Sequence, residues 1–180
     1  MEPEKVALIA SIPKLAAPLI SEEADIVVPK RNDALFQKSH PDYMYISERE
    51  GNELYNAELR SKGILTNKTP DLDFFFGPRV LQNDPKVVAL FIKQYSYRGK
   101  SVLGSLSDPE LYSTTIFFPI IRALRKKLKV KSVEVDFTYP ALQTENEMTG
   151  AKGIFIAKRK LQRMKLLIDL MHFLSLKKNA

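Results

Sequence analysis

Hydroxyl side chains lie where several predicted strands end, and a second group of them precedes an apolar helix. In open α/β sheets, ligands bind outside the carboxyl ends of the strands. Hydroxyls, backbone N–H groups and the helix dipole together favour an anion at such a place. The alternative is that these residues are ordinary N-caps and turn residues. The candidate ligand-binding residues are Ser11, Ser47, Ser105, Ser107, Ser113 and Thr114.

Two pairs of carboxylates are spaced to lie on one face of a strand. They are Asp71 with Asp73 and Glu134 with Asp136. Paired carboxylates can separate their pKa values and act as general acid and general base. Alternation also places polar residues on the solvent face of any half-buried strand, and we expect that simpler role here. No catalytic residue is assigned.

The composition excludes several kinds of chemistry. The 180 residues contain no cysteine, which excludes disulfides, thiolate metal sites, iron–sulfur clusters and cysteine nucleophiles. The two histidines are His40, expected in a loop, and His172, expected to pack partly buried on the last helix. The nucleotide fingerprints GxGxxG and GxxxxGK[ST] and the metal motif HExxH are absent. We therefore expect no metal and no cofactor.

The net charge of +7 lies in the second half of the chain, where residues 101–180 hold 14 Lys and Arg against seven Asp and Glu. The basic runs at residues 122–131 and 158–165 are of the kind that binds nucleic-acid phosphates. Both runs fall on polar sides of predicted helices and lack interleaved aromatic residues. We therefore expect both basic runs to be solvent-exposed helix faces, with binding of nucleic acid as the alternative.

Alternating strand-like and helix-like segments would position these residues. Strands are predicted over residues 5–11, 25–29, 42–47, 72–76, 101–106, 132–137 and 153–157. Helices are predicted over residues 48–62, 85–95 and 158–176, with an apolar helical stripe over 117–128. One side of the last helix carries Leu161, Met164, Ile168, Met171 and Ser175. This alternation indicates an α/β fold with mainly parallel or mixed sheets, in two small lobes over residues 1–96 and 97–180.

Several short segments also follow one another in an order that occurs in a known protein family. They are VALIASIPKLAAP at 6–18, ADIVV at 24–28, DYMYIS at 42–47, RGKSV at 98–102, PAL at 140–142 and GA at 150–151. This order resembles the type II periplasmic solute-binding proteins and their cytosolic enzyme relatives, such as the chorismate dehydratase group of menaquinone synthesis. The resemblance implies two lobes that close on a small ligand, and in the enzyme relatives an elimination reaction.

The function we expect is binding of a small anionic or carboxylate ligand in a cleft between the two lobes. The alternatives are a lyase of the same fold, a module that binds nucleic acid or an acidic partner through the basic half, and a degenerate scaffold without a small-molecule site. The first residues lack the basic and apolar regions of a signal peptide, and the longest uncharged run, residues 111–121, is too short to span a bilayer. We therefore expect a cytoplasmic protein without a membrane span. The exposed side of residues 161–176 offers a face for a homodimer.

Overall fold

A computed structural model describes residues 3–93, 113–149 and 152–175, which form a mixed α/β structure. Their sheet has the strand order β2–β1–β3, with β1 at Ile26–Arg31, β2 at Val80–Leu81 and β3 at Val130–Val135. β3 is parallel to β1, and β2 is antiparallel to it. The helices are η1 (Pro3–Ser11), α1 (Ile12–Ile20), α2 (Asp33–Ser39), α3 (Asp42–Ser61), η2 (Phe74–Phe76), α4 (Pro85–Ile92), η3 (Ser113–Phe117), α5 (Phe118–Arg125), α6 (Ala141–Thr149) and α7 (Lys152–Ser175). The predicted α/β class is confirmed.

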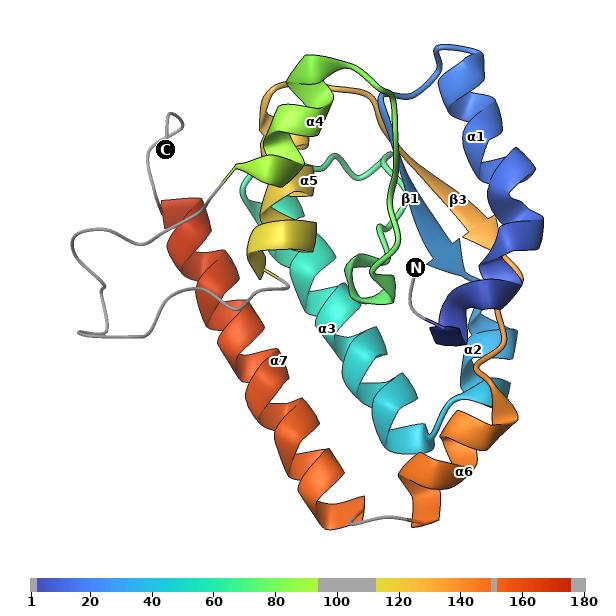
Figure 1. Ribbon diagram of the computed structural model, residues 1–180. Coiled ribbons are helices and arrows are strands. Elements are labelled where there is room, and N and C mark those ends of the chain that lie inside the picture. The colour runs from blue at the N-terminus through green and yellow to red at the C-terminus, as the bar shows by residue number, and fades with distance from the viewer. Residues whose placement is uncertain (1–2, 94–112, 150–151, 176–180) are drawn as a thin grey trace.

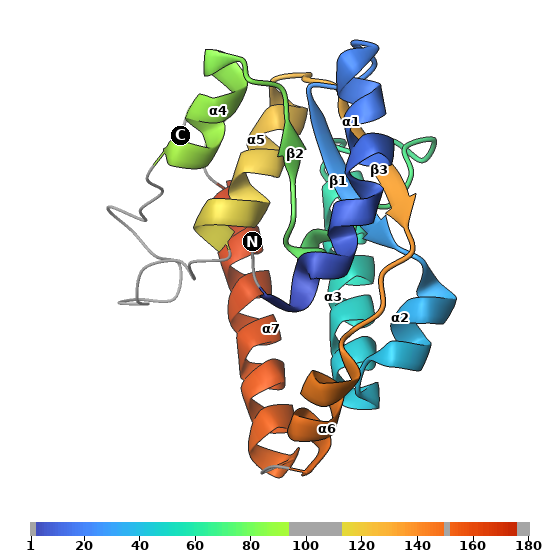
Figure 2. The same cartoon turned by 45° about the vertical axis from the view of Figure 1, so that its right-hand side comes forward.

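The sheet separates two groups of helices (Figures 1 and 2). Ile26 and Val28 belong to a core shared with α3, α4, α5 and α7, whereas Val27 belongs to a core shared with η1 and α1. Successive residues of a strand face opposite sides of a sheet, and these three side chains are fully buried. β1 is therefore a central strand covered on both faces, which explains its continuous apolar run.

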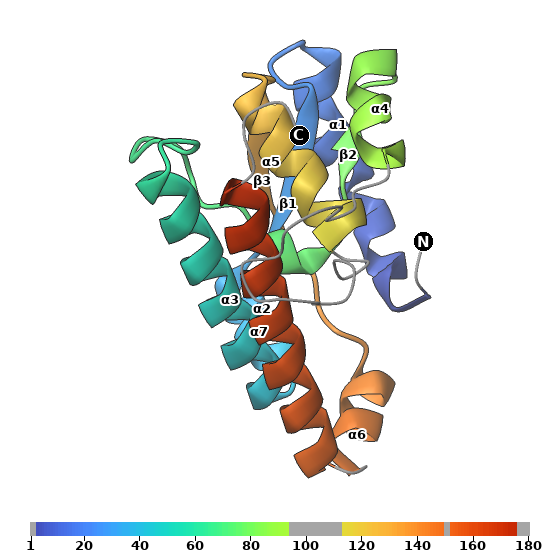
Figure 3. The same cartoon turned by 90° about the vertical axis from the view of Figure 1, so that its left-hand side faces the viewer.

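The two longest helices, α3 and α7, lie side by side and run in the same direction (Figures 1 and 3). Arg159 of α7 lies beside Glu48 of α3, and the Tyr55 hydroxyl of α3 donates a 2.7 Å hydrogen bond to the carbonyl of Leu166 on α7. Residue numbers rise together along both helices, so the pair is parallel. These helices cover the end of β1 where the candidate site lies.

Two predicted strands are confirmed: residues 25–29 and 132–137 correspond to β1 and β3 within two residues at each end. The strand predicted at residues 42–47 is wrong, because these residues begin α3. Pro41 precedes this helix and Asp42 lies in its first turn, and both are helix-start signals. Short apolar runs do not distinguish strand from helix. Three further strand predictions are wrong for this reason: residues 5–11 lie in η1, 72–76 lead into η2, and 153–157 lie in α7.

β1 and β3 come from opposite sides of the predicted lobe boundary at residues 96 and 97, which lies outside the described residues. They pair in register from Ile26 with Val130 to Arg31 with Val135. Both halves of the chain therefore contribute to one sheet. The division into lobes 1–96 and 97–180 stays a prediction, and the strand predicted at residues 101–106 also lies outside the described residues.

Candidate functional site

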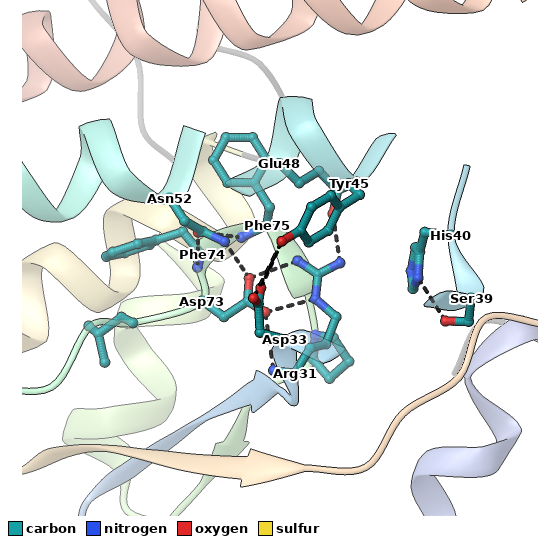
Figure 4. A network of polar contacts seen from close by, with 12 residues as sticks. Arg31, Asp33, Ser39, His40, Tyr45, Glu48, Asn52, Asp73, Phe74 and Phe75 are labelled. Atoms are coloured by element: carbon teal, nitrogen blue, oxygen red, sulfur yellow. Dashed lines mark hydrogen bonds and ion pairs between the residues drawn. The ribbon is translucent and has the colours of Figure 1, made fainter. Parts of the chain in front are cut away.

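The last residue of β1, Arg31, is buried and holds two carboxylates (Figure 4). Its Nε donates to Oδ2 of Asp73 at 2.8 Å, and its Nη2 donates to Oδ1 of the same carboxylate at 2.9 Å. Its Nη1 donates to Oε2 of Glu48 at 2.7 Å. The guanidinium carbon lies 3.6 Å from the centre of the Phe36 ring. Two parallel hydrogen bonds and a ring face fix this guanidinium in one orientation.

Asp73 is held in turn by α3. The amide nitrogen of Asn52 donates to Oδ1 of Asp73 at 2.7 Å, and the amide oxygen of Asn52 accepts from the backbone N–H of Phe74 at 2.8 Å. Burial by itself would raise the pKa of Asp73, but the charge of Arg31 and the hydrogen bonds from Arg31 and Asn52 outweigh it and lower the pKa. Asp73 is therefore a buried anion at neutral pH.

His40 caps the end of α2 and packs among rings. Its ring centre lies 4.5 Å from that of Phe36 and 4.6 Å from that of Tyr139, and its Nδ1 lies 3.1 Å from the Ser39 hydroxyl (Figure 4). Burial, followed by the charge of Arg31, lowers the pKa of His40 to about 3. The imidazole is therefore neutral at neutral pH and adds no charge to the site.

A cavity of about 130 Å³ opens beside Arg31 and Glu48. Side chains from η1, β1, α3, η2, η3 and α7 reach it, so it lies where segments far apart in the sequence meet. Its lining includes the charged residues Lys5, Arg31, Glu48 and Arg159 and the rings of His40, Phe75, Phe76, Phe117, Phe137 and Tyr139.

Two described cations other than Arg31 line this cavity. Nη1 of Arg159 lies 3.6 Å from Oε1 of Glu48, and the side chain of Arg159 remains 33% exposed. The ammonium of Lys5 lies 3.3 Å from the position that a Cβ would take on Gly77. Gly77 has a φ of +91°, which disfavours any residue with a side chain, so glycine allows both the turn and the approach of Lys5.

This lining favours an anion with a flat apolar body. Among the described residues that line the cavity, Lys5, Arg31 and Arg159 are positively charged and Glu48 is negatively charged, and Asp73 next to Arg31 compensates one of the cations. An excess of one charge in a concave, ring-lined site attracts the opposite charge, and ring faces and edges pack well against another ring. Throughout the described ranges, no group of three or more His, Cys, Asp or Glu side chains is placed to hold a metal ion.

The chain matches no protein-family model, no curated protein and no solved structure significantly. In the part of the chain that the structure describes, no helix combines the length and apolarity needed to cross a membrane. The cavity and its charges are therefore the observations on which a function can be proposed.

The described hydroxyl residues that the sequence suggested do not line this cavity. Ser11 is the last residue of η1, and Ser47 is buried within α3, so neither follows a strand. Ser113 and Thr114 lie in η3, and the fully buried Ser113 hydroxyl donates to Oδ2 of Asp169 at 2.8 Å. Ser105 and Ser107 lie outside the described residues.

The solvent-face prediction for the carboxylate pairs is confirmed for Glu134 and Asp136, which are exposed. It is confirmed for Asp71 but wrong for Asp73, which is 6% exposed and binds Arg31. Sequence reasoning also missed Arg31, although a charged residue at the end of a β-branched strand is a usable signal. The strand's carboxyl end is where α/β proteins place ligand-binding groups.

Proposed function

We propose that this protein binds a small carboxylate with one ring in the cavity beside Arg31. One observation carries the proposal: among the described residues, three cations and one carboxylate, that of Glu48, line a cavity whose remaining wall is mostly aromatic. A carboxylate held by Arg159 and Lys5 would form charge-assisted hydrogen bonds, which are stronger than neutral ones. The ring of the ligand would lie against Phe75, Phe117 and their neighbours.

The size of the cavity limits the ligand. Its volume is about 130 Å³, close to the roughly 150 Å³ of an engineered protein cavity that binds benzene. One six-membered ring fits such a volume, and the carboxylate would lie at the side where Arg159 is part-exposed. The proposed ligand class is therefore aromatic or cyclic monocarboxylates of the size of benzoate.

Binding explains the site better than the lyase alternative. An elimination needs a general base within hydrogen-bond reach of the substrate, with a pKa suited to the operating pH. His40, with its pKa of about 3, is too weak a base at neutral pH. Glu48 already accepts from Arg31 and lies beside Arg159. The periplasmic-binding architecture, the nucleic-acid alternative and the cytoplasmic location stay predictions, and this proposal requires none of them.

The test compares benzoate with benzamide, which has nearly the same shape but no charge. A ligand present at 100 times its dissociation constant stabilises the native state by about 2.7 kcal/mol. We therefore expect benzoate to raise the melting temperature and benzamide to leave it nearly unchanged. Equal effects of the two compounds, or no effect of either, would contradict the proposal.

Variants of α7 identify the residue that holds the carboxylate. Arg159→Gln should weaken benzoate binding in calorimetry by about tenfold or more, because hydrogen bonds to charged groups contribute roughly 1.5–3 kcal/mol. Lys158→Gln is the matched control, since Lys158 is its neighbour on the same helix but is exposed and does not line the cavity. Equal affinities of the two variants would place the carboxylate elsewhere.

A further inference from the structure

The outward face of α7 is apolar and uncovered by the described residues. Ile154, Leu161, Met164 and Met171 are 69, 67, 58 and 64% exposed. The opposite side of the same helix buries Leu166, Leu170 and Phe173 in the main core. α7 therefore has two apolar sides, and one of them packs in the described core. Soluble proteins rarely expose continuous apolar patches without an interaction that covers them.

The exposed side follows a coiled-coil repeat. Its residues recur at alternating steps of three and four: Ile154, Ala157, Leu161, Met164, Ile168, Met171 and Ser175. Such a spacing averages 3.5 residues and keeps one narrow seam directed at a partner helix. At a rise of about 1.5 Å per residue, the seam from Ile154 to Met171 is roughly 26 Å long. This length corresponds to roughly five turns of a second helix.

Three lysines flank the seam in the first two thirds of α7. Lys158 and Lys165 follow seam positions on one side, and Lys160 precedes one on the other, which are the positions that select coiled-coil partners. Lys165 also forms an ion pair with Asp169 of its own helix. Asp169, the only acidic residue of α7, is 1% exposed, so the outward face presents no carboxylate.

We propose that this face of α7 docks an amphipathic helix of another protein that carries carboxylates beside its own apolar seam. The acidic margins of that helix would meet Lys158 and Lys160, which are exposed and lie on the two sides of the seam. A second copy of this chain fits less well, because a parallel pair would place Lys160 of one copy beside Lys165 of the other. A lipid surface fits less well too, because membrane-binding helices present a broad apolar face, whereas this seam is one narrow stripe.

The experiment uses two labelled synthetic peptides of four heptads, both with Leu at the two seam positions. One peptide has Glu at all flanking positions and the other has Lys, so that each repels itself and stays monomeric. Fluorescence anisotropy with the full chain should show binding of the Glu peptide at least tenfold tighter than binding of the Lys peptide. The double variant K158E/K160E should reverse this preference. Equal binding of both peptides would overturn the proposal.

Seam variants test the site itself. Leu161→Ser with Met164→Ser should reduce Glu-peptide binding at least tenfold and leave the melting temperature unchanged, because both side chains are mostly exposed. Ile20→Ser, on α1 and 81% exposed, is the matched control and should bind as the parent protein does. Undiminished binding by the double variant would overturn the proposal. The proposal would also be overturned if light scattering showed a dimer of the parent protein that the variant with Leu161→Ser and Met164→Ser abolishes. Stronger binding to phosphatidylserine vesicles, measured by sedimentation, than to the Glu peptide would overturn it too.

Discussion

The charge of Arg31 is the most demanding feature of the site, since an arginine cannot lose its proton to escape burial. Burial by itself would lower the pKa of Arg31, but the carboxylates of Asp73 and Glu48 raise it above its ordinary value. Each charge in this group therefore depends on the others. Removing one partner of a buried ion pair is more costly than replacing the whole pair with apolar groups, because it leaves a charge uncompensated.

Asp73→Asn should therefore destabilise the protein strongly. The expected loss is about 3 kcal/mol of unfolding free energy, because Arg31 would keep its charge with one carboxylate fewer. Asp71→Asn is the matched control two residues away: Asp71 pairs with Arg60 but is 54% exposed, so its loss should be below about 1 kcal/mol. Urea unfolding at pH 7 measures both. Similar losses for the two variants would show that the buried network contributes no more than a surface ion pair.

The same two aspartates show what the sequence could not reveal at this scale. An alternating strand over residues 72–76 would place Asp71 and Asp73 on one solvent face. The chain instead turns into η2 after Asp73, and Phe74 and Phe76 are both buried. The partner of Asp73, Arg31, lies 42 residues away. Local periodicity carries no information about such a contact, so the cavity lining could not be deduced from spacing.

At the scale of elements, prediction succeeded where the pattern was long or β-branched and failed where it was short. β1, β3 and most of α7 were predicted, but residues 42–47 and 153–157 were assigned to strands although they begin α3 and α7. Each of these segments has only five or six residues, too few to distinguish a period of 2 from one of 3.6. The apolar stripe along the last helix was identified correctly. Its exposure could not be predicted, because the sequence does not show that the opposite side of the helix packs in the core.

α3 contains a glycine in its middle because a ring approaches its backbone. A Cβ on Gly51 would lie 2.5 Å from Cζ of Phe75, closer than Cβ atoms come to other heavy atoms in proteins. Phe75 also lines the cavity. The glycine costs the helix about 1 kcal/mol relative to alanine, and it allows Phe75 to occupy its place in the wall of the cavity.

Gly51→Ala should therefore destabilise the protein and disturb the cavity together. Overpacking costs about 1–3 kcal/mol and the helix gains about 1 kcal/mol, so the expected net loss is up to about 2 kcal/mol in urea unfolding. Gly153→Ala in α7, where a Cβ meets nothing within 4 Å, is the control and should not lower stability. Because Phe75 must move, Gly51→Ala should also weaken benzoate binding. A variant as stable as the parent protein, with unchanged affinity, would show that the ring shifts freely.

At the scale of the molecule, distant segments determine the structure. The backbone N–H of Asn32 donates to the carbonyl of Val135 at 3.0 Å, and the N–H of Ile26 donates to the carbonyl of Lys129 at 3.2 Å. These bonds join strands about a hundred residues apart. A sequence-based division at residues 96 and 97 follows the change in charge and the change in local pattern, and neither of these shows which strands will pair.

Amide hydrogen exchange tests whether the two halves open together. The N–H groups of Ile26 and Asn32 can exchange only when β1 separates from β3, so both should exchange with the free energy of global unfolding. The N–H of Lys126, which donates to Arg122 within the last turn of α5, should exchange at a lower free energy because local fraying frees it. Exchange measured at increasing urea below the unfolding transition separates the two cases.

If the halves were independent lobes, the amides of β1 would exchange with a free energy below the global value, because the first half could open while the second stayed folded. If the amides of Ile26 and Asn32 both exchange with the free energy of global unfolding, the cavity, which takes residues from both halves, forms only when the whole described fold is complete.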